Sequence, residues 1–168
     1  SQLQETRLIL RLFHQRCLRV GYSAICFSKY LAEDGIIDTI ERDEERIADA
    51  KRNIKEMDLN NKINIYEGDA VEILPNLNNK YDMVFIDAAK GKYTFFLEQS
   101  LRMLNKKGII FADNILYKGY VLSDYNKHKQ RTAVRNLREY IKQTTENTDL
   151  KTQILEVGDG LAITQFCN

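Results

Sequence analysis

The chain has 168 residues, enough for one domain with a substantial buried core. Its composition, with 43% apolar and 29% charged residues and a single proline, is typical of a globular protein and excludes the fibrous and low-complexity classes. A formal net charge of +1 excludes a global field that would attract nucleic acid or an anionic membrane, so either partner would require a local patch.

The three cysteines, Cys17, Cys26 and Cys167, are an odd number without C-x-x-C spacing. This pattern disfavours both a disulfide framework and a zinc site and favours a reducing compartment. No apolar run approaches the roughly 20 residues that cross a bilayer, and the first residues lack the apolar core of a signal peptide. We therefore expect a soluble, cytoplasmic protein with no membrane partner.

From Tyr22 onward, segments of helical and strand character alternate, which predicts a parallel sheet with helices on both faces. Two strands separated by Gly158-Asp159-Gly160 predict a terminal hairpin. No repeat or linker divides the chain, so we expect one domain over residues 1–168. In chain order we predict a helix over Tyr22–Leu31, a strand over Ile36–Ile40, a helix over Asp43–Met57, a strand over Lys62–Tyr66, a short helix over Ala70–Leu74, a strand over Tyr81–Ile86, a helix over Tyr93–Leu104, a turn over Asn105–Gly108, a strand over Ile109–Ala112, a helix over Lys127–Gln143, and strands over Thr152–Val157 and Leu161–Phe166.

Acidic side chains follow successive predicted strands, at the edge where open parallel sheets bind ligands. Glu41 is placed to accept hydrogen bonds from the hydroxyls of a ribose, although it could instead cap a helix or lie on the surface. Asp69 could accept from an adenine amino group, with Gly68 allowing close backbone approach, or it could cap the helix that starts there.

A second polar group follows the next two strands. Asp87, Asp113 and Asn114 supply hard oxygen ligands suited to magnesium, manganese or calcium, and the alternative is that each is a turn or capping residue. Lys90 lies three residues after Asp87, close to the predicted metal, where it could accept a proton. The alternative is an ordinary solvated lysine.

The predicted helix from Lys127 has basic residues at spacings of four, three and four, which form a stripe along one face. Such a stripe could contact the phosphates of RNA, although a charged helix face is more often simply solvated. Its members are Arg131, Arg135, Arg138 and Lys142.

Several motifs together resemble one known family. They are Ile-Glu-Arg-Asp-Glu (40–44), Glu-Gly-Asp-Ala (67–70), Tyr-Asp-Met-Val-Phe-Ile-Asp-Ala-Ala-Lys (81–90), Ala-Asp-Asn-Ile-Leu-Tyr-Lys-Gly (112–119) and Gly-Asp-Gly-Leu-Ala-Ile (158–163). In order and spacing they resemble the cation-dependent O-methyltransferases, over about Gly21 to Gln165. That family includes catechol and caffeoyl-CoA methyltransferases and a bacterial branch that methylates 5-hydroxyuridine in tRNA, which this chain resembles most closely.

The resemblance implies a Rossmann-like class I methyltransferase with a mostly parallel seven-stranded sheet and a C-terminal antiparallel hairpin. It implies an enzyme of the EC 2.1.1 class that uses S-adenosylmethionine and Mg²⁺, or Mn²⁺ or Ca²⁺ in its place. It also implies a homodimer and a tRNA acceptor, with a small catechol-like acceptor as the alternative. By the same resemblance Asp87, Asp113 and Asn114 hold the metal and Lys90 is the base. The implied donor site comprises Gly21, Tyr22, Ser23, Glu41, Gly68, Asp69, Ala70 and Asp87.

The first motif departs from the family pattern, and residues 1–20 are atypical. Gln15 stands where the family has an acid and Cys17 where it has a glycine, and the stretch Arg11 to Arg19 is too basic for a buried first strand. The chain begins at Ser1 without methionine, and the helices that usually precede this motif are expected to be missing. These departures support a rival hypothesis, a non-catalytic RNA-binding or scaffold protein with a degenerate donor pocket. A Rossmann dehydrogenase is disfavoured because G-x-G-x-x-G is lacking.

Overall fold

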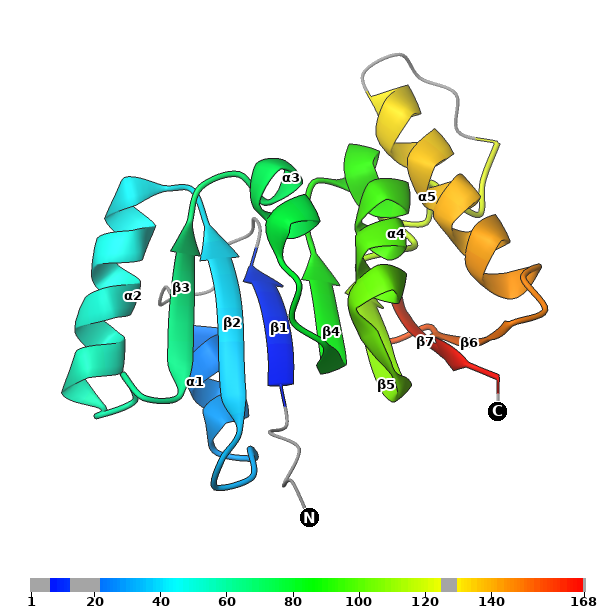
Figure 1. The fold of residues 1–168 in the computed structure, drawn as a ribbon. Helices are drawn as coiled ribbons and strands as arrows, with labels where there is room; N and C mark the ends of the chain where they lie inside the picture. The colour runs from blue at the N-terminus through cyan, green and yellow to red at the C-terminus, as the bar shows by residue number, and fades with distance from the viewer. Residues whose placement is uncertain (1–6, 13–21, 125–129, 168) are drawn as a thin grey trace.

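The computed structural model describes residues 7–12, 22–124 and 130–167. The strands in these ranges form one sheet in the order β3-β2-β1-β4-β5-β7-β6 (Figure 1). Along the chain the elements are β1 (Arg7–Leu12), α1 (Tyr22–Ser28), β2 (Ile36–Glu41), α2 (Glu44–Glu56), β3 (Ile63–Glu67), α3 (Ala70–Ile73), the short helix η1 (Leu74–Asn76), β4 (Tyr81–Asp87), the short helix η2 (Lys90–Lys92), α4 (Tyr93–Met103), β5 (Leu104–Asp113), α5 (Arg131–Thr145), β6 (Leu150–Leu155) and β7 (Leu161–Phe166).

The sheet is mixed. Strands β1 to β5 pair in parallel, whereas β7 runs antiparallel to both β5 and β6. The expectation of a mostly parallel sheet therefore holds for β1 to β5 only, and the predicted antiparallel hairpin is formed by β6 and β7. Because the parallel strands share one direction, their carboxyl ends meet at a single edge.

Strand β1 corrects the prediction for the basic N-terminal stretch. Arg11 and Leu12 belong to a strand that lies between β2 and β4, with Arg11 opposite Ile40 and Ile86. The six residues of β1 read Arg-Leu-Ile-Leu-Arg-Leu, and four of them are aliphatic, so the strand is much less basic than the stretch from Arg11 to Arg19. A strand with neighbours on both sides also satisfies its backbone hydrogen bonds. The rest of the stretch, residues 13–19, lies outside the described residues.

Several boundaries differ from the prediction. Helix α1 ends at Ser28 instead of Leu31, and β6 spans Leu150–Leu155 instead of Thr152–Val157. Residues 105–108, predicted as a turn, belong to β5, where the register shifts between the pairs Tyr81–Leu104 and Met83–Ile109. The Asn105 side-chain amide donates to Asp82 Oδ1 at 2.8 Å, which joins this irregular part of β5 to β4. Helix α5 begins at Arg131 and ends at Thr145, and positions 127–129 of its predicted start are not described.

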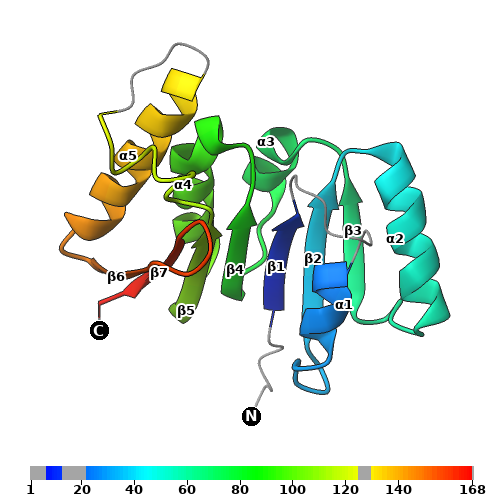
Figure 2. The same ribbon diagram turned by 180° about the vertical axis from the view of Figure 1, so that it is seen from behind.

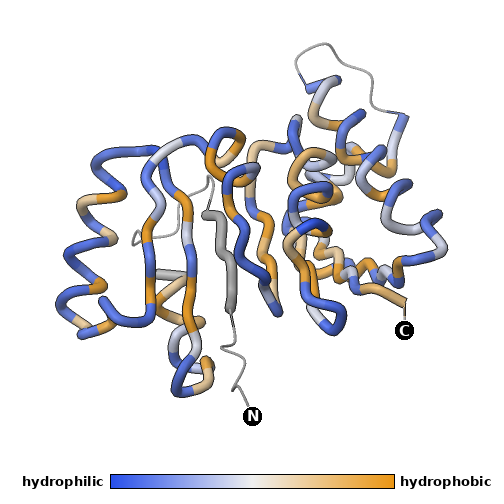
Figure 3. Tube along the Cα trace, in the orientation of Figure 1, coloured by the Kyte–Doolittle hydropathy of each residue, from blue (hydrophilic) through white to orange (hydrophobic). Residues whose placement is uncertain are grey.

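Helices cover both faces of the sheet. Helices α1 and α2 lie on one face, where Ile25 and Ile54 pack with Ile37 and Ile63 (Figure 2). The other face supports α3, α4 and α5 and holds the larger core, which includes Tyr93. Strand β4 is hydrophobic along most of its length, whereas α2 is largely hydrophilic with hydrophobic residues interspersed (Figure 3).

Two acids of the described residues are buried, Glu41 and Asp38, and Asp38 pairs with Tyr81 of the larger core. Asp38 on β2 is fully buried, and its Oδ2 accepts a hydrogen bond of 2.7 Å from the Tyr81 hydroxyl. Its Oδ1 accepts 2.8 Å from the Asn64 side-chain amide. Burial, and then the hydrogen bond to Asp38, raise the pKa of Tyr81 well above its ordinary value, so the phenol stays a donor. This pairing satisfies a carboxylate that would otherwise be costly to bury.

Within the described ranges, Cys26 and Cys167 are free cysteines, and Cys17 lies outside them. No helix of those ranges is both long enough and apolar enough to span a bilayer.

Candidate functional site

The carboxyl edge of the parallel strands brings together most of the predicted site residues. Glu41 ends β2, Asp87 ends β4 and Asp113 ends β5. Strand β1 ends at Leu12, directly beside Asp87. Because all these strands point to the same edge, acids far apart in the sequence converge where they end (Figure 1).

Asp87 is the most perturbed of these acids. It is half-buried, and its Oδ1 atom is fully buried with no hydrogen-bond partner. Desolvation, and next the negative charge of Asp113, raise the pKa of Asp87 to about 6, and the positive charge of Lys90 opposes the shift. Two neighbouring carboxylates, one of which has a buried oxygen without a hydrogen-bond partner, would be stabilised by a positive charge placed between them.

Asn114 and Lys90 complete the group. Asp113 Oδ1 accepts from the Asn114 backbone amide at 2.7 Å and from its side-chain amide at 3.1 Å. The Asn114 Oδ1 atom accepts from Lys90 Nζ at 3.4 Å. Lys90 Nζ also lies 5.6 Å from the centre of the Tyr117 ring, within the range of a cation–π contact. The four predicted side chains therefore share one small site.

Tyr93 supports this site, and sequence reasoning did not identify it. Its ring is fully buried at the start of α4, and its hydroxyl donates to the backbone carbonyl of Asp113 at 2.6 Å. Burial, and then the charge of Asp87, raise the pKa of Tyr93 well above its ordinary value. A neutral tyrosine following a Lys-Gly-Lys segment looks like an ordinary core residue, so only the fold relates it to Asp113.

The residues fit a hard divalent cation. Among the described residues no group of three or more His, Cys, Asp or Glu is clustered closely enough to hold a metal. The set at this edge is instead two carboxylates, Asp87 and Asp113, with the amide oxygen of Asn114. The orphaned Asp87 oxygen and the mutual repulsion of the two acids are the observations that match such an ion.

Glu41 is neither a surface acid nor a helix cap. Its side chain is buried, and Oε1 accepts from the backbone amides of Arg42 at 2.9 Å and Asp43 at 3.0 Å. Asp43, not Glu41, caps α2, since its carboxylate accepts from the amide of Arg46. Arg46 approaches the second oxygen of Glu41 at 4.0 Å. The carboxylate is therefore held in place by its own turn.

For Asp69 the capping interpretation is correct. Its Oδ1 accepts from the Val71 amide at 2.9 Å at the start of α3, and its Oδ2 forms an ion pair of 3.4 Å with Arg42. Gly68 has φ +141°, which a side chain rarely adopts, and its amide donates to the Glu41 carbonyl at 2.8 Å. This bond ties the end of β3 to the end of β2. Ala70 is fully buried beside it.

The predicted first loop lies almost wholly outside the described residues. Gln15, Cys17 and Gly21 are not described. Helix α1 begins at Tyr22, so Tyr22 and Ser23 form its first turn, which places their backbone at the helix start.

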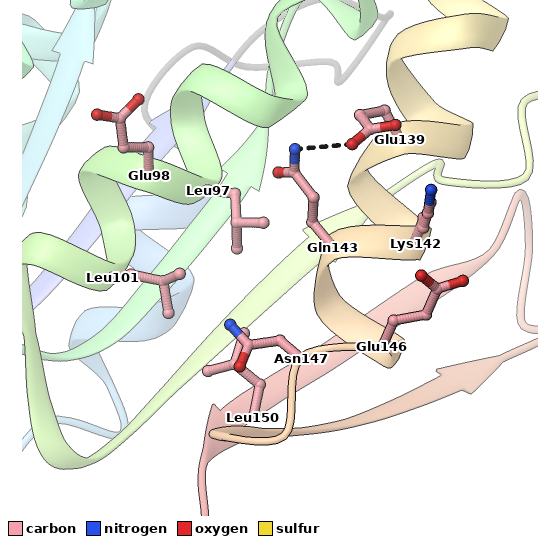
Figure 4. A pocket seen from close by; sticks show the side chains of 9 residues that line it. All are labelled: Leu97, Glu98, Leu101, Glu139, Lys142, Gln143, Glu146, Asn147 and Leu150. Carbon is pink, nitrogen blue, oxygen red and sulfur yellow. Dashed lines mark hydrogen bonds between the residues drawn. The ribbon is translucent and has the colours of Figure 1, made fainter.

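The four residues of the predicted basic stripe have different surroundings. Arg131 and Arg135 are exposed on α5. Arg138 instead bonds to backbone carbonyls of the chain segment after β5, including that of Val121 at 3.1 Å. Lys142 lines a groove of about 460 Å³ between α4 and α5, shared with Glu139, Glu146 and neighbouring side chains (Figure 4). The stripe is therefore less continuous than the spacing suggests.

Most of the chain is similar to proteins of one known family. A profile of the family described as O-methyltransferase matches residues 17–166. Catechol O-methyltransferase from Niastella koreensis is 34% identical over 152 residues, which are 85% of this chain and 67% of that protein. The chain spans about two thirds of the length of the first curated relatives, between 64% and 67%.

Solved structures agree. A Staphylococcus aureus protein assigned as a caffeoyl-CoA O-methyltransferase is 32% identical with a TM-score of 0.82, and the match covers 96% of this chain and 76% of that one. The O-methyltransferase TomG from Streptomyces achromogenes, solved in complex with SAM, has a TM-score of 0.84 at 22% identity, with 98% and 74% covered. At that identity the second likeness concerns the fold alone.

Proposed function

The chain belongs to the O-methyltransferase family, and from that premise we propose that the protein transfers the methyl group of S-adenosylmethionine to a hydroxyl of a small catechol-like acceptor. The similarity to a catechol O-methyltransferase supports this acceptor class. Structures of the same fold that hold SAM or SAH support the donor. The observation on which the proposal rests is the orphaned carboxylate of Asp87, facing Asp113 beside Lys90.

The proposed donor site begins at the ends of β2 and β3. Glu41 has one oxygen fixed by two backbone amides, which leaves its other oxygen to accept from the ribose hydroxyls of the donor. Asp69 and Ala70 lie at the start of α3, beside the φ-positive turn at Gly68, and would border the adenine. Gly21, Tyr22 and Ser23 stay predicted contacts of the methionine end.

Asp87, Asp113 and Asn114 would hold a magnesium ion, with manganese or calcium as substitutes. When bound, such an ion supplies Lewis acidity that lowers the pKa of an acceptor hydroxyl. The protein's own contribution would be electrostatic, because a cation would offset the repulsion between Asp87 and Asp113 and the burial of the unpartnered Asp87 oxygen.

Lys90 is the proposed base. Its Nζ lies 3.4 Å from the Asn114 side-chain oxygen and 5.6 Å from the centre of the Tyr117 ring, so in its neutral form Lys90 would accept a proton from a hydroxyl bound beside Asn114. The hydroxyl proton passes to Lys90 Nζ, and an oxygen electron pair forms the new bond to the methyl carbon. The bond from that carbon to sulfur breaks and leaves S-adenosylhomocysteine. Alignment of donor and acceptor supplies much of the rate.

Calorimetric titration with S-adenosylmethionine, with and without Mg²⁺, tests the donor half of the proposal. We expect binding that Glu41→Gln weakens, because an amide accepts from ribose hydroxyls less strongly than a carboxylate. The exposed acid Glu44 provides a control, since Glu44→Gln should bind as the wild type does. No binding in either condition would contradict the proposal and favour a non-catalytic protein with a degenerate donor pocket.

A tRNA acceptor is the second candidate, favoured by the exposed Arg131 and Arg135 on α5. Mass spectrometry of tRNA nucleosides after incubation with protein, donor and Mg²⁺ separates the candidates. A methyl gain on hydroxyuridine would establish the tRNA acceptor, and salt-dependent tRNA binding without methyl transfer would support an RNA-binding protein. The homodimer also stays a prediction, which light scattering would test.

A further inference from the structure

The segment that follows β5 has an unusual backbone. Asn114, Tyr117 and Lys118 all have positive φ, at 55°, 46° and 56°. Such a conformation is unfavourable for a residue with a side chain and persists only where its surroundings hold it. This backbone directs Asn114 and Tyr117 toward Lys90, at the distances given above. What holds residues 114–123 therefore sets the geometry of the proposed site.

The turn between β6 and β7 holds the first half of this segment. The amide of Leu116 donates to the Asp159 carbonyl at 2.9 Å, and the amide of Ile115 donates to the Gly160 carbonyl at 3.1 Å. The amide of Lys118 donates to Asp159 Oδ1. Gly160 has φ +88°, and a Cβ there would clash with Leu116 Cγ, so the two segments are in close contact.

Arg138 holds the second half from α5. Its Nε donates to the Val121 carbonyl at 3.1 Å, and its Nη2 donates to the carbonyls of Tyr120, at 3.3 Å, and of Ser123. The Tyr120 ring meets the Tyr117 ring edge to face, with centroids 5.7 Å apart. One planar guanidinium thus joins three carbonyls, which a lysine ammonium cannot match in the same arrangement.

We propose that Asp159 and Arg138 are positioning residues, which clamp residues 114–123 so that Asn114 and Tyr117 face Lys90. The inference rests on the proposed methyl transfer. Asp159 acts through the Lys118 amide and Arg138 through the backbone carbonyls, so both act on the site through this segment. In this role Arg138 stabilises the backbone of the site, whereas the sequence had suggested that it contacts the phosphates of RNA. Residues that orient metal ligands in this indirect way typically contribute about 10- to 100-fold to metal affinity or activity.

Four variants test the clamp. Asp159→Ala and Arg138→Ala remove the side-chain contacts of the clamp. Asp159→Asn keeps a side-chain oxygen for the Lys118 amide, and Arg138→Lys keeps the positive charge but loses the planar guanidinium. Glu156→Ala, in the same turn, and Lys151→Ala, on β6, are exposed controls of matching charge. For each, we would measure Mn²⁺ affinity by the electron paramagnetic resonance of free Mn²⁺, hydrogen exchange of the segment's amides, and kcat and KM for methyl transfer.

We expect both alanine variants to speed exchange at 115–118 and to lower Mn²⁺ affinity or kcat about 10- to 100-fold. Asp159→Asn should retain most of the wild-type Mn²⁺ affinity and kcat, whereas Arg138→Lys should lose nearly as much as Arg138→Ala. The controls should match the wild type. Alanine variants with wild-type Mn²⁺ affinity and kinetic constants would overturn the positioning role, whatever their melting temperatures. A wild type that neither binds Mn²⁺ nor transfers methyl would instead defeat the proposed function, so the two failures are distinguishable.

Discussion

Asp87→Asn should stabilise the metal-free protein while abolishing the proposed metal site. The substitution keeps the shape of the side chain and removes a charge that is desolvated and repelled by Asp113. A rise in pKa from the ordinary 3.8 to about 6 corresponds to roughly 3 kcal/mol at about 1.4 kcal/mol per pKa unit. Since the side chain is only half-buried, solvent screening reduces the expected gain to about 1–2 kcal/mol.

The pH dependence has a definite sign. Because the folded-state pKa is raised, the folded state binds more protons than the unfolded state between pH 3.8 and about pH 6, so the ionised group costs stability as pH rises through that window. The advantage of Asp87→Asn should therefore be complete at about pH 8 and vanish below about pH 4. This cost is what a bound cation would offset.

Urea unfolding in EDTA at several pH values measures this effect, with Asp34→Asn, an exposed acid, as the control. Added Mg²⁺ should then stabilise the wild type but not Asp87→Asn, because ligand binding stabilises only a folded state that has the site. Equal or lower stability of Asp87→Asn at about pH 8 would refute the reasoning, because it would mean that the carboxylate pays no electrostatic cost.

Three other substitutions test separate parts of the account. Tyr81→Phe should lower the free energy of unfolding by about 1–3 kcal/mol because it removes a donor from buried Asp38, whereas Tyr30→Phe at an 87%-exposed position should not; urea titration distinguishes them. Gly68→Ala should weaken donor binding in calorimetry, since φ +141° resists a side chain and the turn supports Glu41. Lys90→Gln should lower kcat about 100-fold or more with donor affinity retained, and equal losses in both would contradict its role as base.

Local patterns predicted most of the helices and strands after Tyr22. In α2, for example, the buried residues are Ile47, Ala50 and Ile54, whose spacings of three and four are the local pattern of a helix with one buried face. Strand β1 was missed because its aliphatic residues, 8–10, precede the basic stretch that was considered, and because its partners β2 and β4 are distant in the sequence. Residues 105–108 were predicted as a turn because their pairing with β4 is equally non-local.

The site was predictable in its residue types and less so in their partners. Because parallel strands end at one common edge, the polar residues that follow them could be predicted to lie together. These residues are Asp87, Lys90, Asp113 and Asn114. The orphaned oxygen of Asp87 and the bond from Tyr93 to Asp113 depend on packing, which no spacing encodes. Charge spacing likewise identified Arg138 as basic and helical but could not reveal the carbonyls that it binds.

Incubation of the protein with Mg²⁺, a catechol acceptor and S-adenosylmethionine labelled in its methyl group tests the central claim most directly. We expect the label to appear on one acceptor oxygen, EDTA to stop the transfer, and Lys90→Gln to slow it while the donor still binds. Bound donor with no labelled product, for catechol and tRNA acceptors alike, would contradict the claim.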